Sequence, residues 1–137
     1  MRKIPLLFFL FGCLLFADKL NAQNTSPVTT VIKDWTGLLE TQTECEIYYS
    51  YVKCDEERKV LFKFYNEVPF NQNIKFKVTV KYIGYTITEE KTKVVAPNQT
   101  IVGECSSTDS NLFIKLLPQW DFERTIITAE IIQVTTN

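Results

Sequence analysis

A strict alternation of apolar and polar residues runs through the middle of this 137-residue chain. Between Ile74 and Tyr82 every second residue is apolar, and the residues between them are lysine or threonine. Because successive side chains of a β-strand point to opposite faces, this pattern predicts a strand with one buried and one solvated face. The apolar positions are Ile74, Phe76, Val78, Val80 and Tyr82.

Similar short segments recur along the chain, separated by turn residues. We expect a turn at 71–73, where two asparagines flank a glutamine, and another at Ile83-Gly84. The strand at 85–95 carries many charges, which predicts an edge strand, whereas 124–134 is apolar on both faces, which predicts a central strand. The remaining expected strands cover residues 28–35, 45–51, 60–65, 100–105 and 112–117.

Seven or eight short strands without an amphipathic helix predict an all-β fold. A single antiparallel β-sandwich is the favoured architecture, and a small closed barrel is the alternative. The sequence shows no internal repeat and no linker, so we expect one domain, at residues 23–137.

The first 22 residues have the features of a cleaved signal peptide. Arg2 and Lys3 precede an almost wholly apolar run over 4–17, and cleavage is expected between Ala22 and Gln23. A lipoprotein attached through Cys13 is the less favoured alternative. The apolar run is shorter than the roughly 20 residues of a membrane-spanning helix, so no transmembrane span is expected in the mature chain. We therefore expect a protein that is secreted or periplasmic.

Composition excludes several functions. The chain contains no histidine, which removes Ser-His-Asp and Cys-His catalytic groups and histidine-containing zinc sites. It contains four glycines in all and no glycine-rich phosphate loop. The formal net charge of -1 argues against a nucleic-acid partner. We expect no catalytic residue, no cofactor and no metal site.

Three cysteines, Cys45, Cys54 and Cys105, fall in the expected mature chain. An exported protein favours disulfides, and an odd number leaves one thiol unpaired. A Cys54–Cys105 bridge would join distant strands, whereas a Cys45–Cys54 bridge would be local. Cys45 alternates with core positions and could instead be a buried free thiol. Acidic residues at 55–57 follow Cys54 and disfavour a nucleophilic thiolate there.

Aromatic residues at positions expected to be exposed offer a surface on which sugar rings could stack. Trp120 is the first candidate because it lies in a proline-containing loop, and Trp35 is the second. The alternative is that both tryptophans fill the core between the sheets. Further candidate aromatics are Tyr48, Tyr65 and Tyr85.

Lysines at Lys75, Lys77 and Lys81 share one face of the central alternating strand. They could meet an anionic surface, but alternating lysine is also how a solvated sheet face is kept soluble. We favour the solvated face, with Glu89 and Glu90 as cross-strand partners. Lysines that could extend the row on neighbouring strands are Lys63, Lys91 and Lys93.

The order of these segments resembles small secreted Bacteroidetes proteins with an immunoglobulin-like or fibronectin-like sandwich. The resemblance spans residues 47–117, and the turn, short strand and cysteine at 97–105 are its most specific part. The resemblance implies that Cys54 and Cys105 have counterparts in those proteins, which favours the Cys54–Cys105 bridge. It implies no activity. We therefore expect an exported, non-enzymatic sandwich domain that contacts an unknown protein or glycan partner. The alternative is a carbohydrate-binding module that uses Trp120 and Trp35.

Overall fold

The computed structural model describes residues 25–137, which form eight β-strands and one short 3-10 helix. The expected signal peptide at 1–22 and the alternative lipid anchor at Cys13 lie outside the described residues. Within 25–137 no helix is long and apolar enough to span a membrane. The elements are β1 (Thr29–Glu40), β2 (Cys45–Cys54), β3 (Glu57–Asn66), β4 (Gln72–Tyr82), β5 (Tyr85–Val95), β6 (Thr100–Val102), η1 (Ser110–Leu112), β7 (Phe113–Leu116) and β8 (Thr125–Thr136).

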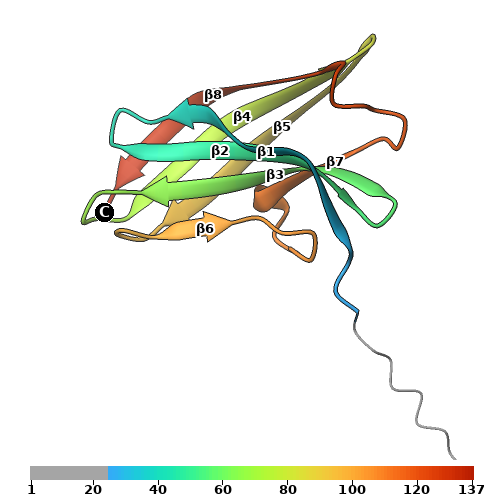
Figure 1. The fold of residues 1–137 in the computed structure, drawn as a ribbon. Helices are drawn as coiled ribbons and strands as arrows, with labels where there is room; N and C mark the ends of the chain where they lie inside the picture. Colours follow the sequence, from blue (N-terminus) through green and yellow to red (C-terminus); the bar gives the residue numbers. More distant parts are fainter. Residues whose placement is uncertain (1–24) are drawn as a thin grey trace, which may run out of the picture.

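The described strands form two antiparallel sheets, which lie as two layers in Figure 1. Sheet A has the order β1-β2-β3-β6, and β7 pairs with the same side of β3 as β6 but nearer to the start of that strand. Sheet B has the order β5-β4-β8. The expected all-β, antiparallel fold of seven or eight strands is confirmed, and the observed number is eight.

The strand order has a simple local origin. β1, β2 and β3 follow one another as hairpin-connected neighbours, so β2 lies between β1 and β3. In an immunoglobulin constant domain the second strand instead lies beside the fifth. The connections therefore differ from those of that domain, although both have two facing antiparallel sheets.

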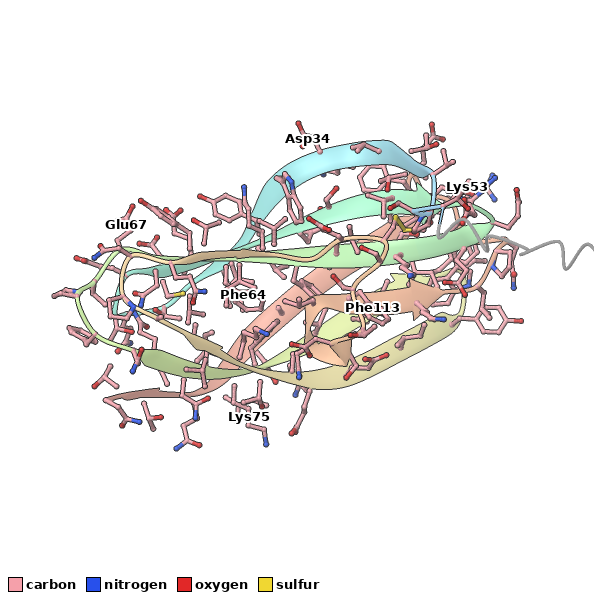
Figure 2. All side chains as sticks on the ribbon, turned by 90° about the horizontal axis from the view of Figure 1, so that it is seen from below. Asp34, Lys53, Phe64, Glu67, Lys75 and Phe113 are labelled. Atoms are coloured by element: carbon pink, nitrogen blue, oxygen red, sulfur yellow. A yellow bond between two sulfur atoms is a disulfide. The ribbon has the colours of Figure 1, made fainter. Side chains whose placement is uncertain are left out.

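The alternating residues of β4 face sheet A, as their pattern predicts. Ile74, Phe76 and Val78 have no exposed surface. The ring of Phe76 lies edge-on to those of Phe62 and Phe64 in β3, at centroid distances of 5.8 and 5.7 Å. Figure 2 shows Phe64 between the two sheets and Lys75 pointing away from them. The fold is therefore a sandwich with its core between the layers.

The outer face of sheet B is solvated and ion-paired. Lys75 pairs with Glu90 at 2.6 Å, and Lys77 pairs with Glu130 of β8. Cross-strand pairs of this exposed kind contribute little to stability, about 0 to 1 kcal/mol each. They confirm the solvated face and the partner Glu90, whereas the other expected partner, Glu89, pairs with Lys91 instead.

Lys91 does not join that row. It lies opposite Phe76 in the β4–β5 register and is therefore on the inner face of sheet B. Its Nζ donates to the carbonyls of Ser110 at 2.6 Å and Phe113 at 2.8 Å and contacts Glu89 Oε2 at 2.5 Å. The prediction that Lys91 is solvated is wrong, because backbone carbonyls at the open side of the sandwich replace water around its ammonium group.

Two other expectations are also wrong. β8 is an edge strand, in which Ile126 and Ile132 are exposed and Ile132 is skipped in the pairing with β4. Its second apolar face is therefore turned toward solvent. Residues 71–73 are not a turn, because Gln72 begins β4 and is completely buried.

The turn between β4 and β5 consists of Ile83 and Gly84, as expected, since Tyr82 pairs with Tyr85. Both turn residues have positive φ, 28° and 79°. A β-branched side chain such as that of Ile83 is unfavourable in this region, whereas asparagine before glycine is well suited to it.

We expect Ile83→Asn to raise the free energy of unfolding by about 0.5 to 1 kcal/mol. Ile83 is mostly exposed, so the exchange removes little buried apolar surface. Urea denaturation followed by circular dichroism measures the effect. Ile83→Val, which keeps the β-branch, is the control and should bring no gain. A less stable asparagine variant would contradict the argument.

Candidate functional site

The outer face of sheet A gathers several of the candidate aromatics. Tyr48 of β2 and Tyr65 of β3 lie on the face opposite the core, and Trp35 of β1 packs over the same face. Lys63 lies among them, with its Nζ 4.4 Å from the ring centroid of Tyr48 and 5.1 Å from that of Trp35. The sheet register thus places Tyr48 and Tyr65 on one face, and Lys63 links Tyr48 to Trp35.

A disulfide joins Cys54 at the end of β2 to Cys105, in the segment that follows β6. The favoured pairing is thereby confirmed. Because β3 lies between β2 and β6, the bridge draws this segment across the outer face of β3, over Leu61. Figure 2 shows the bonded sulfur atoms near Lys53. The buried Lys59 supports the crossing, because its Nζ donates to the carbonyl of Cys105 at 3.0 Å.

The crossing segment begins at Gly103, where two stretches of backbone approach closely. The Gly103 N–H donates to the carbonyl of Phe62 at 2.8 Å. A Cβ at this position would lie 2.4 Å from the carbonyl oxygen of Leu112. Only glycine therefore fits, and the segment is fixed at its start by this approach and at Cys105 by the disulfide.

At the opposite edge of sheet A from β6, β1 arches away from β2. Lys33 pairs with Tyr51 and Thr36 with Tyr49, so the two residues between Lys33 and Thr36 face a single residue of β2. At the crest of the arch, labelled in Figure 2, Asp34 Oδ1 accepts a hydrogen bond from the Trp35 N–H at 2.7 Å. The bulge thus sets the position of Trp35 above the outer face.

A cleft of about 330 Å³ lies between the arch of β1 and the disulfide-anchored segment. We call it the Trp35 cleft. Its volume is at the lower end of the range of small-molecule sites. The charged residues that line it, Asp34 and Glu104, are both acidic. The complete lining is Ser26, Pro27, Thr29, Val31, Asp34, Trp35, Ser50, Val52, Leu61, Gly103, Glu104, Cys105 and Ser106.

Trp120 does not contribute to this surface, and its expected role in ligand stacking is wrong for this structure. Its side chain is 1% exposed and stacks on Tyr82 at a centroid distance of 5.3 Å. Its carbonyl accepts hydrogen bonds from Tyr51 Oη and from the guanidinium of Arg58, both at 2.5 Å. The tryptophan is a core residue that closes one end of the sandwich, which is the alternative considered from the sequence. Tyr85 lies at the β4–β5 hairpin of sheet B.

Sequence reasoning missed the acidic lining at Asp34 and Glu104. The irregular pairing that exposes Asp34 leaves no periodic signal in the sequence. Glu104 could have been suspected from the glycine and cysteine on either side of it, which mark a tightly held segment. Among residues 25–137, no three Cys, Asp or Glu side chains are placed to hold a metal ion.

Cys45, the first residue of β2, is a free thiol with no exposed surface. Burial is the main reason that the pKa of the Cys45 thiol rises from 9.0 to about 11, and the carboxylate of Glu46 adds to the rise. Folding therefore favours the protonated thiol. Its contribution to stability is present below about pH 9 and is lost as the pH rises toward about 11.

We expect iodoacetamide at pH 8 to leave Cys45 unmodified in the native protein and to modify it fully in denaturant. Burial blocks access, and the raised pKa keeps the thiolate fraction low. Mass spectrometry of the tryptic peptide that contains Cys45 measures the labelling. Native labelling as fast as that of glutathione would show that the thiol is accessible.

No protein-family model matches the sequence, and no curated protein or solved structure is detectably similar to it. The geometry of the outer face of sheet A and of the Trp35 cleft therefore carries the functional argument.

Proposed function

We propose that this protein is an exported, non-enzymatic β-sandwich domain that binds a protein or glycan partner through the outer face of sheet A. The observation that carries the proposal is the cleft of about 330 Å³ on that face, which is lined by Trp35, a ring that shares the ammonium group of Lys63 with Tyr48. Concave sites with aromatic walls and a few polar groups are typical of ligand recognition.

The contrast between the two outer faces supports this choice. On sheet B, Lys75 and Lys77 are neutralised by Glu90 and Glu130, and Thr79 and Thr88 are within hydrogen-bonding distance of each other across β4 and β5. Most of the charge on that face is therefore already paired within the protein. On sheet A, aromatic rings and the acidic lining of the cleft meet solvent, so this face offers more to a partner.

Export is supported by the disulfide together with the signal-like residues 1–22. Structural disulfides persist mainly in oxidising compartments. N-terminal sequencing of the protein isolated from its producing cell tests this part of the proposal, with Gln23 as the expected first residue. If the chain instead begins at a lipid-modified Cys13, the protein is a membrane-anchored lipoprotein and is not secreted.

A non-enzymatic role is supported by the state of the most reactive side chains. The chain has no histidine. Cys54 and Cys105 are paired, and Cys45 is buried, so none of them offers a thiolate to the Trp35 cleft. These residues leave the cleft suited to binding.

Site-specific photo-crosslinking in the producing cell tests the binding face. A photoreactive phenylalanine at Tyr65 places the probe on the outer face of sheet A, and the same probe at Thr128 places it on the outer face of sheet B. We expect discrete adducts from position 65 and none from position 128. Adducts from position 128 alone, or equally from both, would overturn the assignment of the face.

A further inference from the structure

The composition of the Trp35 cleft narrows the chemistry of its ligand. We propose that the cleft binds the ring of a neutral sugar, an inference that rests on the proposed binding function of this face. A sugar ring combines an apolar C–H face with hydroxyl groups around its edge. The cleft offers an aromatic wall and hydrogen-bond acceptors to match both parts.

The aromatic wall is the ring of Trp35. It is held by the arch of β1, by packing against the outer apolar cluster of Val52 and Leu61, and by Lys63, whose Nζ lies 5.1 Å from the ring centroid. Trp35 keeps part of its surface exposed in the cleft. A tryptophan held in this way presents a large apolar surface at little entropic cost.

The polar lining suits hydroxyl donors. The carboxylates of Asp34 and Glu104 lie on opposite walls, one on the arch and one on the disulfide-anchored segment, and both residues are exposed. Carboxylates accept hydrogen bonds from hydroxyl groups strongly. Serine and threonine residues complete the lining with hydroxyls that can donate or accept: Ser26, Thr29, Ser50 and Ser106.

Charge disfavours an anionic ligand. Both charged lining residues are acidic, and the two lysines that contact lining residues through Cys105 and Trp35 are already engaged. Lys59 donates to the Cys105 carbonyl and pairs with Glu57, and Lys63 lies against aromatic rings. A uronic acid or sulfated sugar would enter the field of two carboxylates without a free cation, so the neutral ring is the better fit.

The cleft is formed before any ligand arrives. The disulfide and the close approach at Gly103 hold one wall, and the Asp34–Trp35 hydrogen bond orders the other. Preorganised walls reduce the entropy lost on binding. A rigid aromatic residue in such a site is expected to dominate the affinity.

A single-tryptophan reporter tests the proposal directly. The chain has two tryptophans, so Trp120→Phe leaves Trp35 as the only one. We would titrate this variant, and the wild type in parallel, with hexasaccharides of glucose, mannose, galactose, xylose and N-acetylglucosamine while following tryptophan fluorescence. At least one neutral sugar should give a saturable shift, and hexagalacturonate, which the two carboxylates of the lining repel, should give none. No saturation by any neutral sugar, or saturation only by a charged oligomer, would overturn the proposal.

Matched variants locate the site by calorimetry in the wild-type background. Trp35→Ala should weaken binding of the active sugar by about tenfold or more, because tryptophan anchors commonly carry this much of an interface. Tyr85→Ala, which removes an exposed aromatic from sheet B, should leave affinity unchanged, and circular dichroism checks that both variants are folded. Equal losses of affinity in the two variants would show that the sugar does not bind in the Trp35 cleft. Adducts at position 65 in the crosslinking experiment would still support the binding face if no sugar bound.

Discussion

Replacement of both Cys54 and Cys105 by serine is expected to lower the free energy of unfolding by about 4 kcal/mol, because the bridge closes a long loop in the unfolded chain. The two cysteines are 51 residues apart. The free energy of unfolding of a typical domain is only about 5 to 15 kcal/mol, so the bridge would supply a large share of the stability. Guanidinium denaturation, with the native signal of circular dichroism as readout, measures the loss.

Cys45→Ser is the matched control for that double variant. This variant also replaces a buried sulfur, but Cys45 closes no loop in the unfolded chain. The free energy of unfolding should therefore fall clearly less than in the double variant. Reduction of the wild-type protein should reproduce the destabilisation of the double variant. A change below about 1 kcal/mol in the double variant would show that the bridge adds little to the packing of the segment it anchors.

Asn66→Ala is expected to destabilise the fold by about 3 to 5 kcal/mol, because it leaves several buried polar groups without partners. Asn66 is completely buried at the end of β3. Its Nδ2 donates to the carbonyls of Phe70, Val95 and Ala96 at 2.9, 3.1 and 3.0 Å. Its Oδ1 accepts from Gln72 Nε2 at 2.9 Å.

Asn73→Ala is the control for this prediction. Asn73 lies in β4 next to Gln72, but its side chain is exposed on the outer face of sheet B. Its replacement should therefore change stability by no more than about 0.5 kcal/mol. Thermal and urea unfolding of the two variants should separate them clearly. Equal stabilities would mean that water replaces the lost amide of Asn66 without cost.

The sequence predicts the strands of this protein well, and the reason is physical. A core between two sheets requires every second residue to be apolar, and this requirement is visible in the sequence at Ile74–Tyr82 and in most other strands. The turn at Ile83-Gly84 follows from local chemistry, and the Cys54–Cys105 bridge is favoured over its rival by the resemblance to small secreted sandwich proteins. These features need no knowledge of which strands are neighbours.

The errors concern residues whose role depends on strand order. The apolar pattern of β8 looks central, although β8 forms the edge of sheet B. Lys91 follows the pattern of a solvated strand, although its ammonium group finds carbonyls at the open side of the sandwich. Trp120 lies in a loop, which suggests exposure, although that loop folds back into the core. Only the arrangement of the sheets decides each case.

The same dependence explains the candidate site. Trp35 was a candidate from the sequence, but the cleft beside it requires the arch of β1 and the segment tied down by Cys105. These two walls come from parts of the chain separated by about half of its length. The sequence could name one residue of the site and could not assemble the rest.

The irregular path of β1 also bears on how copies of this protein meet one another. Its pairing with β2 shifts register at three places, so the free edge of sheet A is not straight. A neighbouring molecule that approached this edge would find N–H and C=O groups out of line and could not extend the sheet by adding a strand. The distortion that raises Trp35 above sheet A thus also protects that edge against fibrillar growth.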